Sequence, residues 1–154
     1  MTNHVRRATP LDADAILAIG ASDPAFRVSD RVSFYEREEL VEWAIAPQDN
    51  LLFVSEGPEG FTGFCFCKVM SSHWAVLDNF YVVPSRRGTG TAEALRTALL
   101  GALHERHVRY VSTLVALDDR RLAERLSGYG FRQSRDYGWL EVFLGDEEGV
   151  SGAR

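Results

Sequence analysis

Apolar runs about as long as a β-strand alternate with polar, turn-rich stretches along most of this 154-residue chain. Runs of this kind predict strands. Five are expected, at Val5–Ala8, Leu51–Ser55, Phe61–Val69, Trp74–Val83 and Tyr110–Ala116. Two further strands are expected between Phe131 and Leu144, around the turn Asp136–Gly138.

Helix signals fill the first gap between these runs. Thr9 and Pro10 suit the N-cap and the first position of a helix that Gly20 can end. A second helical region is expected from Ser33 to Ala46, because Pro47 stops it. Both helices precede the longest strands.

Two more helices are expected in the second half of the chain. After the strand expected at Trp74–Val83, apolar residues at i, i+3, i+4, i+7 and i+8 predict the buried stripe of a long helix. The stripe consists of Leu95, Ala98, Leu99, Ala102 and Leu103. A fourth helix is expected between a cap at Asp118 or Asp119 and an end at Gly128.

Together the elements predict an α/β (α+β) fold, with a mixed, mostly antiparallel sheet of about seven strands flanked by about four helices. The early strands can form an antiparallel meander, whereas the crossover through Thr91–Arg106 requires at least one parallel pair. Residues 1–145 are expected to form one domain, followed by a disordered acidic tail at 146–154. The strand Trp139–Leu144 can lie at a sheet edge and pair with a second copy as a homodimer.

Composition and charge exclude several classes of function. A net charge of −5 disfavours nucleic-acid binding, which needs a basic stripe. No apolar run reaches the roughly eighteen residues of a membrane span, and the start lacks a secretory signal, so a cytoplasmic protein is expected. Cys65 and Cys67 are expected to fill the core, and no metal site is expected because further ligands at suitable spacing are lacking.

The candidate chemistry lies in Arg87-Gly88-Thr89-Gly90-Thr91-Ala92, between an apolar strand and an amphipathic helix. Glycine has no Cβ, so a ligand can approach the backbone of such a loop. The free N–H groups and the dipole of a helix start favour an anion. Arg86 and Arg87 add bidentate donors for phosphate. The segment therefore predicts a phosphate-binding loop.

Three kinds of phosphate loop compete for this segment. A Walker A loop does not fit, because no Gly-Lys-Ser/Thr sequence follows. The dinucleotide pattern G-x-G-x-x-G has Gly88 and Gly90, but Glu93 stands at its third glycine position. The pattern R-x-x-G-x-A fits at every position from Arg87 to Ala92.

On this motif the chain resembles the GNAT superfamily of N-acetyltransferases, over the stretch from Val5 to about Leu144. Tyr81–Ala92 is similar to the acetyl-CoA motif of that family. Val5–Ala15 resembles its first strand and helix start, and Tyr129-Gly130-Phe131 resembles its later Gly-Phe landmark. The resemblance implies a GNAT-like fold and an acetyl-CoA-dependent N-acetyltransferase. Its acceptor would be a primary amine of a small molecule or peptide that attacks the thioester directly.

The resemblance also assigns residues to acetyl-CoA. Five residues would hold the CoA pyrophosphate through their backbone N–H groups: Gly88, Thr89, Gly90, Thr91 and Ala92. Arg86 and Arg87 would assist the phosphates, and Asp119 and Arg125 would line the other side of the CoA channel. The backbone of Phe80 to Val82 would pair with the pantetheine arm. One N–H there, expected at Tyr81, would polarise the thioester carbonyl.

An amine must lose a proton before it attacks a thioester. With a pKa of about 10.4, its ammonium form at neutral pH imposes a cost on the order of 4 kcal/mol unless a local base accepts the proton. Asp78 is the expected base, because Leu77–Val82 looks like the strand of spermidine/spermine acetyltransferases that carries an acid there. Asn79 is expected to orient the amine, and Phe26 and Tyr35 to wall the acceptor pocket.

One position departs from the family pattern. Many members carry a tyrosine four residues before the glycine of the Gly-Phe landmark, as the acid for the leaving thiolate, and here that position is Leu126. A thiolate with a pKa of about 8.5 can leave without that acid. The departure keeps a second hypothesis open, a non-catalytic acyl-CoA-binding module. A nucleotide- or dinucleotide-binding domain is the third.

Overall fold

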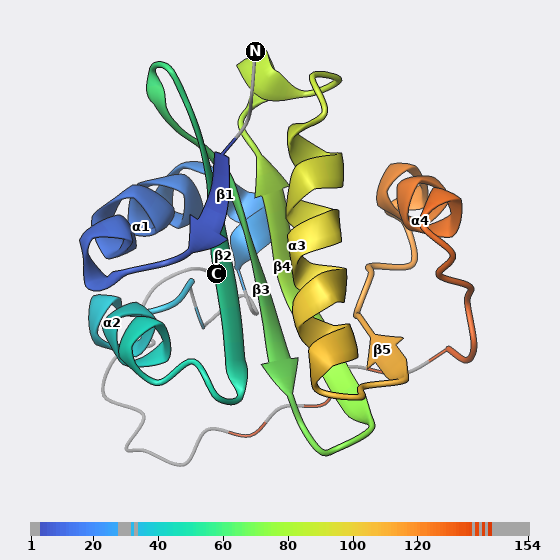
Figure 1. Ribbon diagram of the computed structural model, residues 1–154. Helices are drawn as coiled ribbons and strands as arrows, with labels where there is room; N and C mark the ends of the chain where they lie inside the picture. The colour runs from blue at the N-terminus through green and yellow to red at the C-terminus, as the bar shows by residue number, and fades with distance from the viewer. Residues whose placement is uncertain are drawn as a thin grey trace. The chain divides into compact units, whose positions relative to one another are not determined.

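The apolar runs of the chain form a five-stranded sheet in the computed structural model (Figure 1). The structure describes residues 4–27, 32, 34–136, 138, 140 and 142. Contacts divide the chain into two units, Met1–Leu114, which holds the sheet, and Val115–Arg154. The expectation of one domain over residues 1–145 stays a prediction.

The strands of the sheet lie in sequence order, β1-β2-β3-β4-β5. They are β1 (His4–Arg7), β2 (Asn50–Gly57), β3 (Gly60–Val69), β4 (Trp74–Val82) and β5 (Tyr110–Ser112). The first four pair antiparallel, and β4 pairs parallel with β5. The predicted meander, the one parallel pair and the mixed, mostly antiparallel fold class are therefore confirmed.

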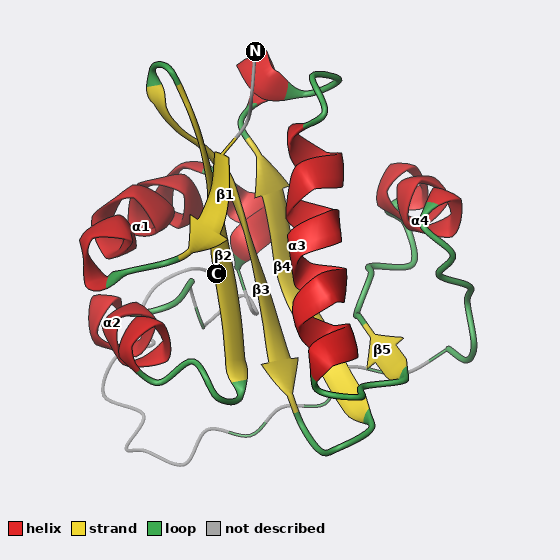
Figure 2. Cartoon of the chain, viewed as in Figure 1, coloured by secondary structure: helices red, strands yellow, loops and turns green. Residues whose placement is uncertain are grey.

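Helices cover both faces of this sheet (Figures 1 and 2). The helices α1 (Ala13–Ser22) and α2 (Arg37–Ile45) lie on one side of it, and α3 (Thr91–Glu105) lies on the other. Successive side chains of a strand point to opposite faces. Phe64 accordingly packs with the α1 and α2 residues Ile16 and Leu40, whereas a Cβ at the preceding Gly63 would lie 3.3 Å from Leu95 of α3.

The buried face of α3 is the stripe that the sequence predicts. Leu95, Leu99, Ala102 and Leu103 are buried, and Ala98 is half-buried. Thr91 in the first turn is fully buried as well. The start of α3, and with it the end of the glycine loop, is therefore held against the sheet.

Three element boundaries differ from the expected ones. The helix α1 passes through Gly20, where a Cβ would lie 1.9 Å from Phe34 Cδ1, so the glycine leaves room for a ring and does not end the helix. The helix α2 begins at Arg37, because Glu36 has an extended backbone and shares a capping box with Glu39. The expected start at Ser33 lies outside the described residues. The strand β5 ends at Ser112 and does not reach Ala116.

The two strands expected between Phe131 and Leu144 do not appear in the described part of that segment, residues 131–136, 138, 140 and 142. Residues 132–136 are all exposed, so they bury no apolar face against a sheet. The rest of the segment, with Trp139 and Leu144, lies outside the described residues, as does the tail 146–154. Homodimer formation through Trp139–Leu144 stays a prediction.

The second unit contains α4 (Arg120–Gly128). The Asp119 carboxylate caps it by accepting a hydrogen bond from the Leu122 N–H at 3.0 Å. Beyond its end, Gly130 has a φ of 91°, a conformation that glycine adopts readily. The predicted cap and the predicted end at Gly128 are confirmed. No helix in the described part of the chain has the length and apolar character needed to cross a membrane.

Candidate functional site

One part of β4 has a free edge. The strand β5 pairs with β4 only from Trp74 to Val76. The later residues Leu77–Val82 therefore have no strand partner on that side among the residues described. Backbone N–H and C=O groups on such an edge can pair with an extended ligand. Phe80, Tyr81 and Val82, which are expected to meet the pantetheine arm, lie in this segment.

A β-bulge at Asp78 interrupts the other side of β4. Asn79 lies opposite Phe66, and Leu77 lies opposite the adjacent Cys67, so Asp78 is the extra residue. A bulge redirects the side chain that it carries. Leu77 is buried, whereas the Asp78 side chain is exposed. The bulge thus leaves a carboxylate accessible on a strand that otherwise supports the core.

Tyr35 and Asn79 both contact this carboxylate. The Tyr35 hydroxyl donates a hydrogen bond to Asp78 Oδ2 and accepts one from Asn79 Nδ2. Asn79 Nδ2 also lies 3.2 Å from the same Oδ2. Burial and the charge of Asp78 raise the pKa of Tyr35, which keeps its hydroxyl protonated. The structure therefore brings together the expected base and two of the expected acceptor residues.

Aromatic rings support this cluster. The Tyr35 ring meets Trp43 edge to face, with centroids 4.9 Å apart, and Trp43 stacks on Phe66 at 4.3 Å. Phe26 meets Tyr81 edge to face at 5.4 Å and packs against the core. Phe26 therefore supports β4, and its expected contact with an acceptor stays a prediction.

The loop between β4 and α3 has the backbone geometry of an anion site. Gly88 and Gly90 have φ of 77° and 86°, which glycine adopts without steric cost. A Cβ added at either would meet nothing within 4 Å, so the space around them is open. Among the described residues, no backbone acceptor takes the N–H of Gly88, Gly90, Thr91 or Ala92. These donors and the helix start can hold a pyrophosphate.

Threonine hydroxyl groups hold the loop from within. Thr89 Oγ1 donates to the Arg86 carbonyl at 2.7 Å and lies 3.2 Å from Thr91 Oγ1. Because Thr91 is fully buried, this chain of contacts joins the loop to the core. The loop conformation thus depends on its own side chains as well as on its glycines.

The two arginines of the loop fold back onto the sheet. Arg87 Nε donates to the Val82 carbonyl at 3.1 Å, and its guanidinium lies 5.9 Å from the centre of the Tyr81 ring. A Cβ at Gly57 would lie 2.7 Å from Arg86 Nη2, so the Arg86 guanidinium lies against the end of β2. The expected contacts of both arginines with CoA phosphates stay predictions.

The other residues expected along the CoA channel lie in the second unit. Asp119 is the cap of α4, and Arg125 lies in its last turn, next to Leu126. Their expected positions beside CoA stay predictions.

The bulge at Asp78 and the bond between Tyr35 and Asp78 are not among the features predicted from the sequence. A signal for the bulge is present, because Asp and Asn are unfavourable inside strands and Asp78-Asn79 interrupts an apolar run. No local signal joins Tyr35 to Asp78, since 43 positions separate them and only the folded chain brings them together.

Two buried thiols lie in β3. Cys65 and Cys67 are free and buried, as expected. Burial raises the pKa of both thiols, that of Cys67 to about 12, so they stay protonated near neutral pH. In the part of the chain that is described, no group of three or more His, Cys, Asp or Glu side chains is placed to hold a metal ion.

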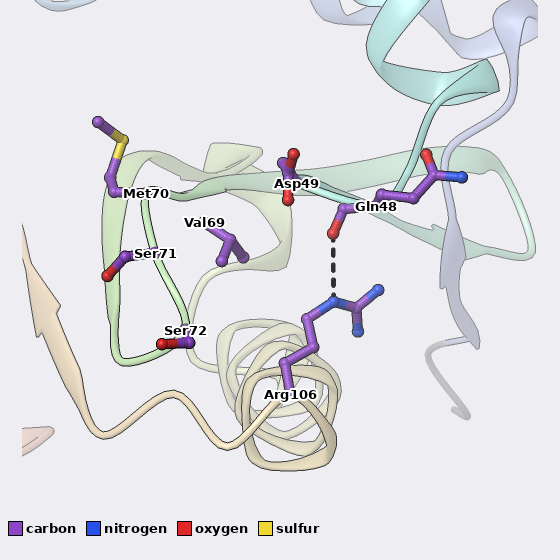
Figure 3. Close-up of a pocket in the computed structure, with 7 residues that line it drawn as sticks. All are labelled: Gln48, Asp49, Val69, Met70, Ser71, Ser72 and Arg106. Atoms are coloured by element: carbon purple, nitrogen blue, oxygen red, sulfur yellow. Dashed lines mark hydrogen bonds between the residues drawn. The ribbon is translucent and has the colours of Figure 1, made fainter.

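A separate hollow of about 320 Å³ lies at the opposite end of β4 and α3 (Figure 3). Its lining comes from the β3–β4 turn, the segment before β2 and the end of α3. The residues are Gln48, Asp49, Val69, Met70, Ser71, Ser72 and Arg106. Arg106 Nε donates to the Gln48 carbonyl at 3.3 Å. The glycine loop follows the other end of β4, so this hollow is not part of the candidate site.

Comparison with known proteins decides the family. The model of the acetyltransferase (GNAT) family matches residues 20–131, which include β4, the glycine loop and α3. The chain belongs to the GNAT acetyltransferase family. The expected family and the expected class of enzyme, an acetyltransferase, are confirmed.

Solved structures share the fold of this GNAT protein. The PaiA N-acetyltransferase from Thermoplasma acidophilum, in complex with coenzyme A, is 13% identical with a TM-score of 0.71, over 90% of this chain and 94% of its own. Ard1 from Thermoplasma volcanium is 19% identical with a TM-score of 0.67, over 88% and 86%. An aminoglycoside acetyltransferase from an uncultured soil metagenomic sample is 14% identical with a TM-score of 0.71, over 93% and 97%. The search of curated proteins gives no match.

Proposed function

We propose that this GNAT protein transfers the acetyl group of acetyl-CoA to a primary amine of a small molecule or peptide, by direct attack of the amine on the thioester. The position of Asp78 carries the proposal. Asp78 lies at a β-bulge in β4, the strand that has a free edge and that the glycine loop follows. A carboxylate that could accept a proton and a loop that could bind an anion thus lie along one strand, which supports acyl transfer from CoA to an amine.

The residues present fit acetyl-CoA. The N–H groups from Gly88 to Ala92 would bind the pyrophosphate at the start of α3. The free edge from Phe80 to Val82 would pair with the pantetheine amides as an added strand does. The register turns the Tyr81 N–H towards β3, because Val83, two residues later, donates to the Thr62 carbonyl there. One N–H of the free edge, at Phe80 or Val82, would instead stabilise the oxyanion that develops on the thioester carbonyl. The coenzyme A held by the PaiA structure supports this assignment.

Asp78 would accept the proton of the acceptor amine. The nitrogen lone pair then forms the bond to the acyl carbon, the C–S bond breaks, and the sulfur leaves as a thiolate. As the amide forms, the nitrogen loses a second proton, which the thiolate takes up. Because that thiolate has a pKa of about 8.5, it can leave without an acid at the position of Leu126. Catalysis is therefore compatible with the missing tyrosine.

The acceptor we propose is a cationic small-molecule amine. Burial is the main cause that raises the pKa of Tyr35, and the charges of Asp78 and Glu39 add to it, so two carboxylates lie near its hydroxyl. A negative site attracts an ammonium group. The aminoglycoside acetyltransferase fold, solved also in complex with sisomicin, supports an acceptor of this class.

Two measurements test the proposed function. In a melting screen, acetyl-CoA should stabilise the protein and neither ATP nor NAD should; ligand at about 100 times Kd adds about 2.7 kcal/mol. Release of free CoA is then followed over a panel of aminoglycosides, polyamines and peptides. Binding of acetyl-CoA without turnover on any amine would favour the acyl-CoA-binding module. Stabilisation by NAD or ATP alone would contradict both hypotheses.

Asp78→Asn tests the base directly. The substitution removes proton acceptance and keeps the shape of the side chain, so kcat should fall by about 100-fold while stabilisation by acetyl-CoA is retained. Asp49→Asn, at the opposite end of the sheet, is the matched control and should turn over like the wild type. Steady-state CoA release and melting curves give both quantities. If Asp78→Asn turned over like the wild type across the pH range, Asp78 would be excluded as the base.

A further inference from the structure

The Tyr35 side chain is fixed beside Asp78 by aromatic packing. Its ring lies 4.9 Å from Trp43 and 5.8 Å from Phe66, edge to face in both cases. Trp43 and Phe66 are themselves stacked, with an interplanar angle of 7°. Phe66 lies in β3 opposite Asn79. A ring held by α2 and β3 therefore presents its hydroxyl to the bulge in β4.

The hydrogen bonds of Asp78 with described residues involve one carboxylate oxygen. Tyr35 donates to Oδ2, and Asn79 Nδ2 lies 3.2 Å from the same atom. Asn79 also donates to the Tyr35 hydroxyl oxygen, which closes a ring of three side chains. Among the described residues, no hydrogen bond uses Oδ1. Because the side chain is exposed, a ligand can reach that oxygen.

We infer that Tyr35 is the positioning residue of the proposed acetyl transfer, holding Asp78 Oδ2 so that Oδ1 receives the proton of the acceptor amine. The inference rests on the proposed function, in which Asp78 is the base. The proton moves from the amine nitrogen to Oδ1, the N–C bond forms and the C–S bond breaks. The bond from Tyr35 to Oδ2 persists throughout, and Tyr35 itself gives up no proton.

The environment of Tyr35 suits a permanent donor. Burial and the charge of Asp78 raise its pKa, so the hydroxyl keeps its proton in the pH range in which an amine can be deprotonated and acetylated. A phenol that donates a charge-assisted hydrogen bond to a carboxylate fixes the orientation of that carboxylate. Tyr35 would therefore act through Asp78 and not on the substrate itself.

A double-mutant cycle separates this role from a structural one. Tyr35→Phe keeps the ring against Trp43 and removes only the hydroxyl. Its kcat for the best amine of the panel should fall by about tenfold to a hundredfold, while the KM for acetyl-CoA and the stabilisation by acetyl-CoA stay as in the wild type. Tyr110→Phe, at an exposed position on β5, is the matched control and should keep full activity.

The decisive comparison is made in the Asp78→Asn background. A residue that acts through Asp78 has nothing to position there, so Tyr35→Phe/Asp78→Asn should be no slower than Asp78→Asn alone. If the two effects multiply, or if Tyr35→Phe turns over like the wild type, the positioning role is overturned while the proposed function stands. If the wild type acetylates no amine of the panel, the proposed function fails and this inference fails with it.

Discussion

The phenol of Tyr35 is a single group whose ionisation links the site to stability. Burial and the Asp78 charge raise its pKa above the ordinary value of 10.0, because each disfavours the phenolate. In the unfolded chain the phenol ionises near that ordinary value. A group whose pKa is raised on folding stabilises the fold fully below its unfolded pKa, and this contribution is lost as the pH rises.

We therefore expect the free energy of unfolding to decrease as the pH rises above 10.0. From Tyr35 alone the slope is about 1.4 kcal/mol per pH unit, because the unfolded chain releases one proton that the folded chain retains. Tyr35→Phe should remove this slope, and Tyr110→Phe should keep it, since Tyr110 is exposed. Urea unfolding from about pH 9 to about pH 11 measures it. Equal slopes in the wild type and Tyr35→Phe would argue against a retained proton.

Among the elements, the glycine loop combines a left-handed backbone with open space. Gly90 is the N-cap of α3, with φ of 86° and ψ of −4°. An L-residue with a side chain pays about 1–2 kcal/mol for a left-handed backbone. Because a Cβ at Gly90 would meet no atom within 4 Å, packing adds no further cost. The new methyl group would instead stand in the space that a pyrophosphate needs.

Gly90→Ala should therefore lower the free energy of unfolding by about 1–2 kcal/mol and weaken acetyl-CoA binding. Gly101→Ala, inside α3, is the matched control, because its Cβ also meets no atom and its backbone is helical. It should stabilise the helix by about 0.5–1 kcal/mol and leave acetyl-CoA binding intact. Melting curves with and without acetyl-CoA report both effects. A full acetyl-CoA shift in Gly90→Ala would count against the loop as the pyrophosphate site.

The elements also show where local patterns suffice for prediction. The stripe of α3 and the glycine loop could be predicted because each depends on residues close in sequence. The start of α2 also has a local signal, the capping box of Glu36 and Glu39, but the apolar pattern that begins at Phe34 hides it. Gly20 looked like a helix end because its partner, the Phe34 ring, is set by tertiary packing. The bond between Tyr35 and Asp78 was missed for the same reason.

For the whole molecule, Arg6 links the first helical segment to the sheet. Its guanidinium binds both Asp12 oxygens, at 2.8 and 2.9 Å, and reaches Glu56 Oε1 at 2.5 Å. Arg6 lies in β1, Glu56 in β2, and Asp12 in the 3-10 helix Pro10–Asp12. Burial alone would raise the pKa of Asp12, but hydrogen bonds from Arg6 and Thr9 outweigh it and lower that pKa. The charged form of Asp12 therefore favours the folded chain.

Because the pKa of Asp12 is lowered in the folded chain, its contribution to stability is lost in acid. The contribution of Asp12 is complete above its unfolded pKa of about 3.8 and is lost as the pH falls through the lower folded value. Asp12→Asn should cost roughly 2 kcal/mol at neutral pH, because Arg6 loses a charged partner. The difference in the free energy of unfolding between wild type and Asp12→Asn should narrow as the pH falls below 3.8.

Chemical unfolding at neutral pH and at about pH 3 measures that difference. Glu93→Gln is the matched control, since it removes the ion pair of an exposed carboxylate with Arg96 and should change stability little. A difference of the same size at both pH values would mean that Asp12 acts through its shape and not its charge. A difference that narrows in acid would show that the ion pairs joining β1, β2 and the 3-10 helix Pro10–Asp12 are acid-sensitive.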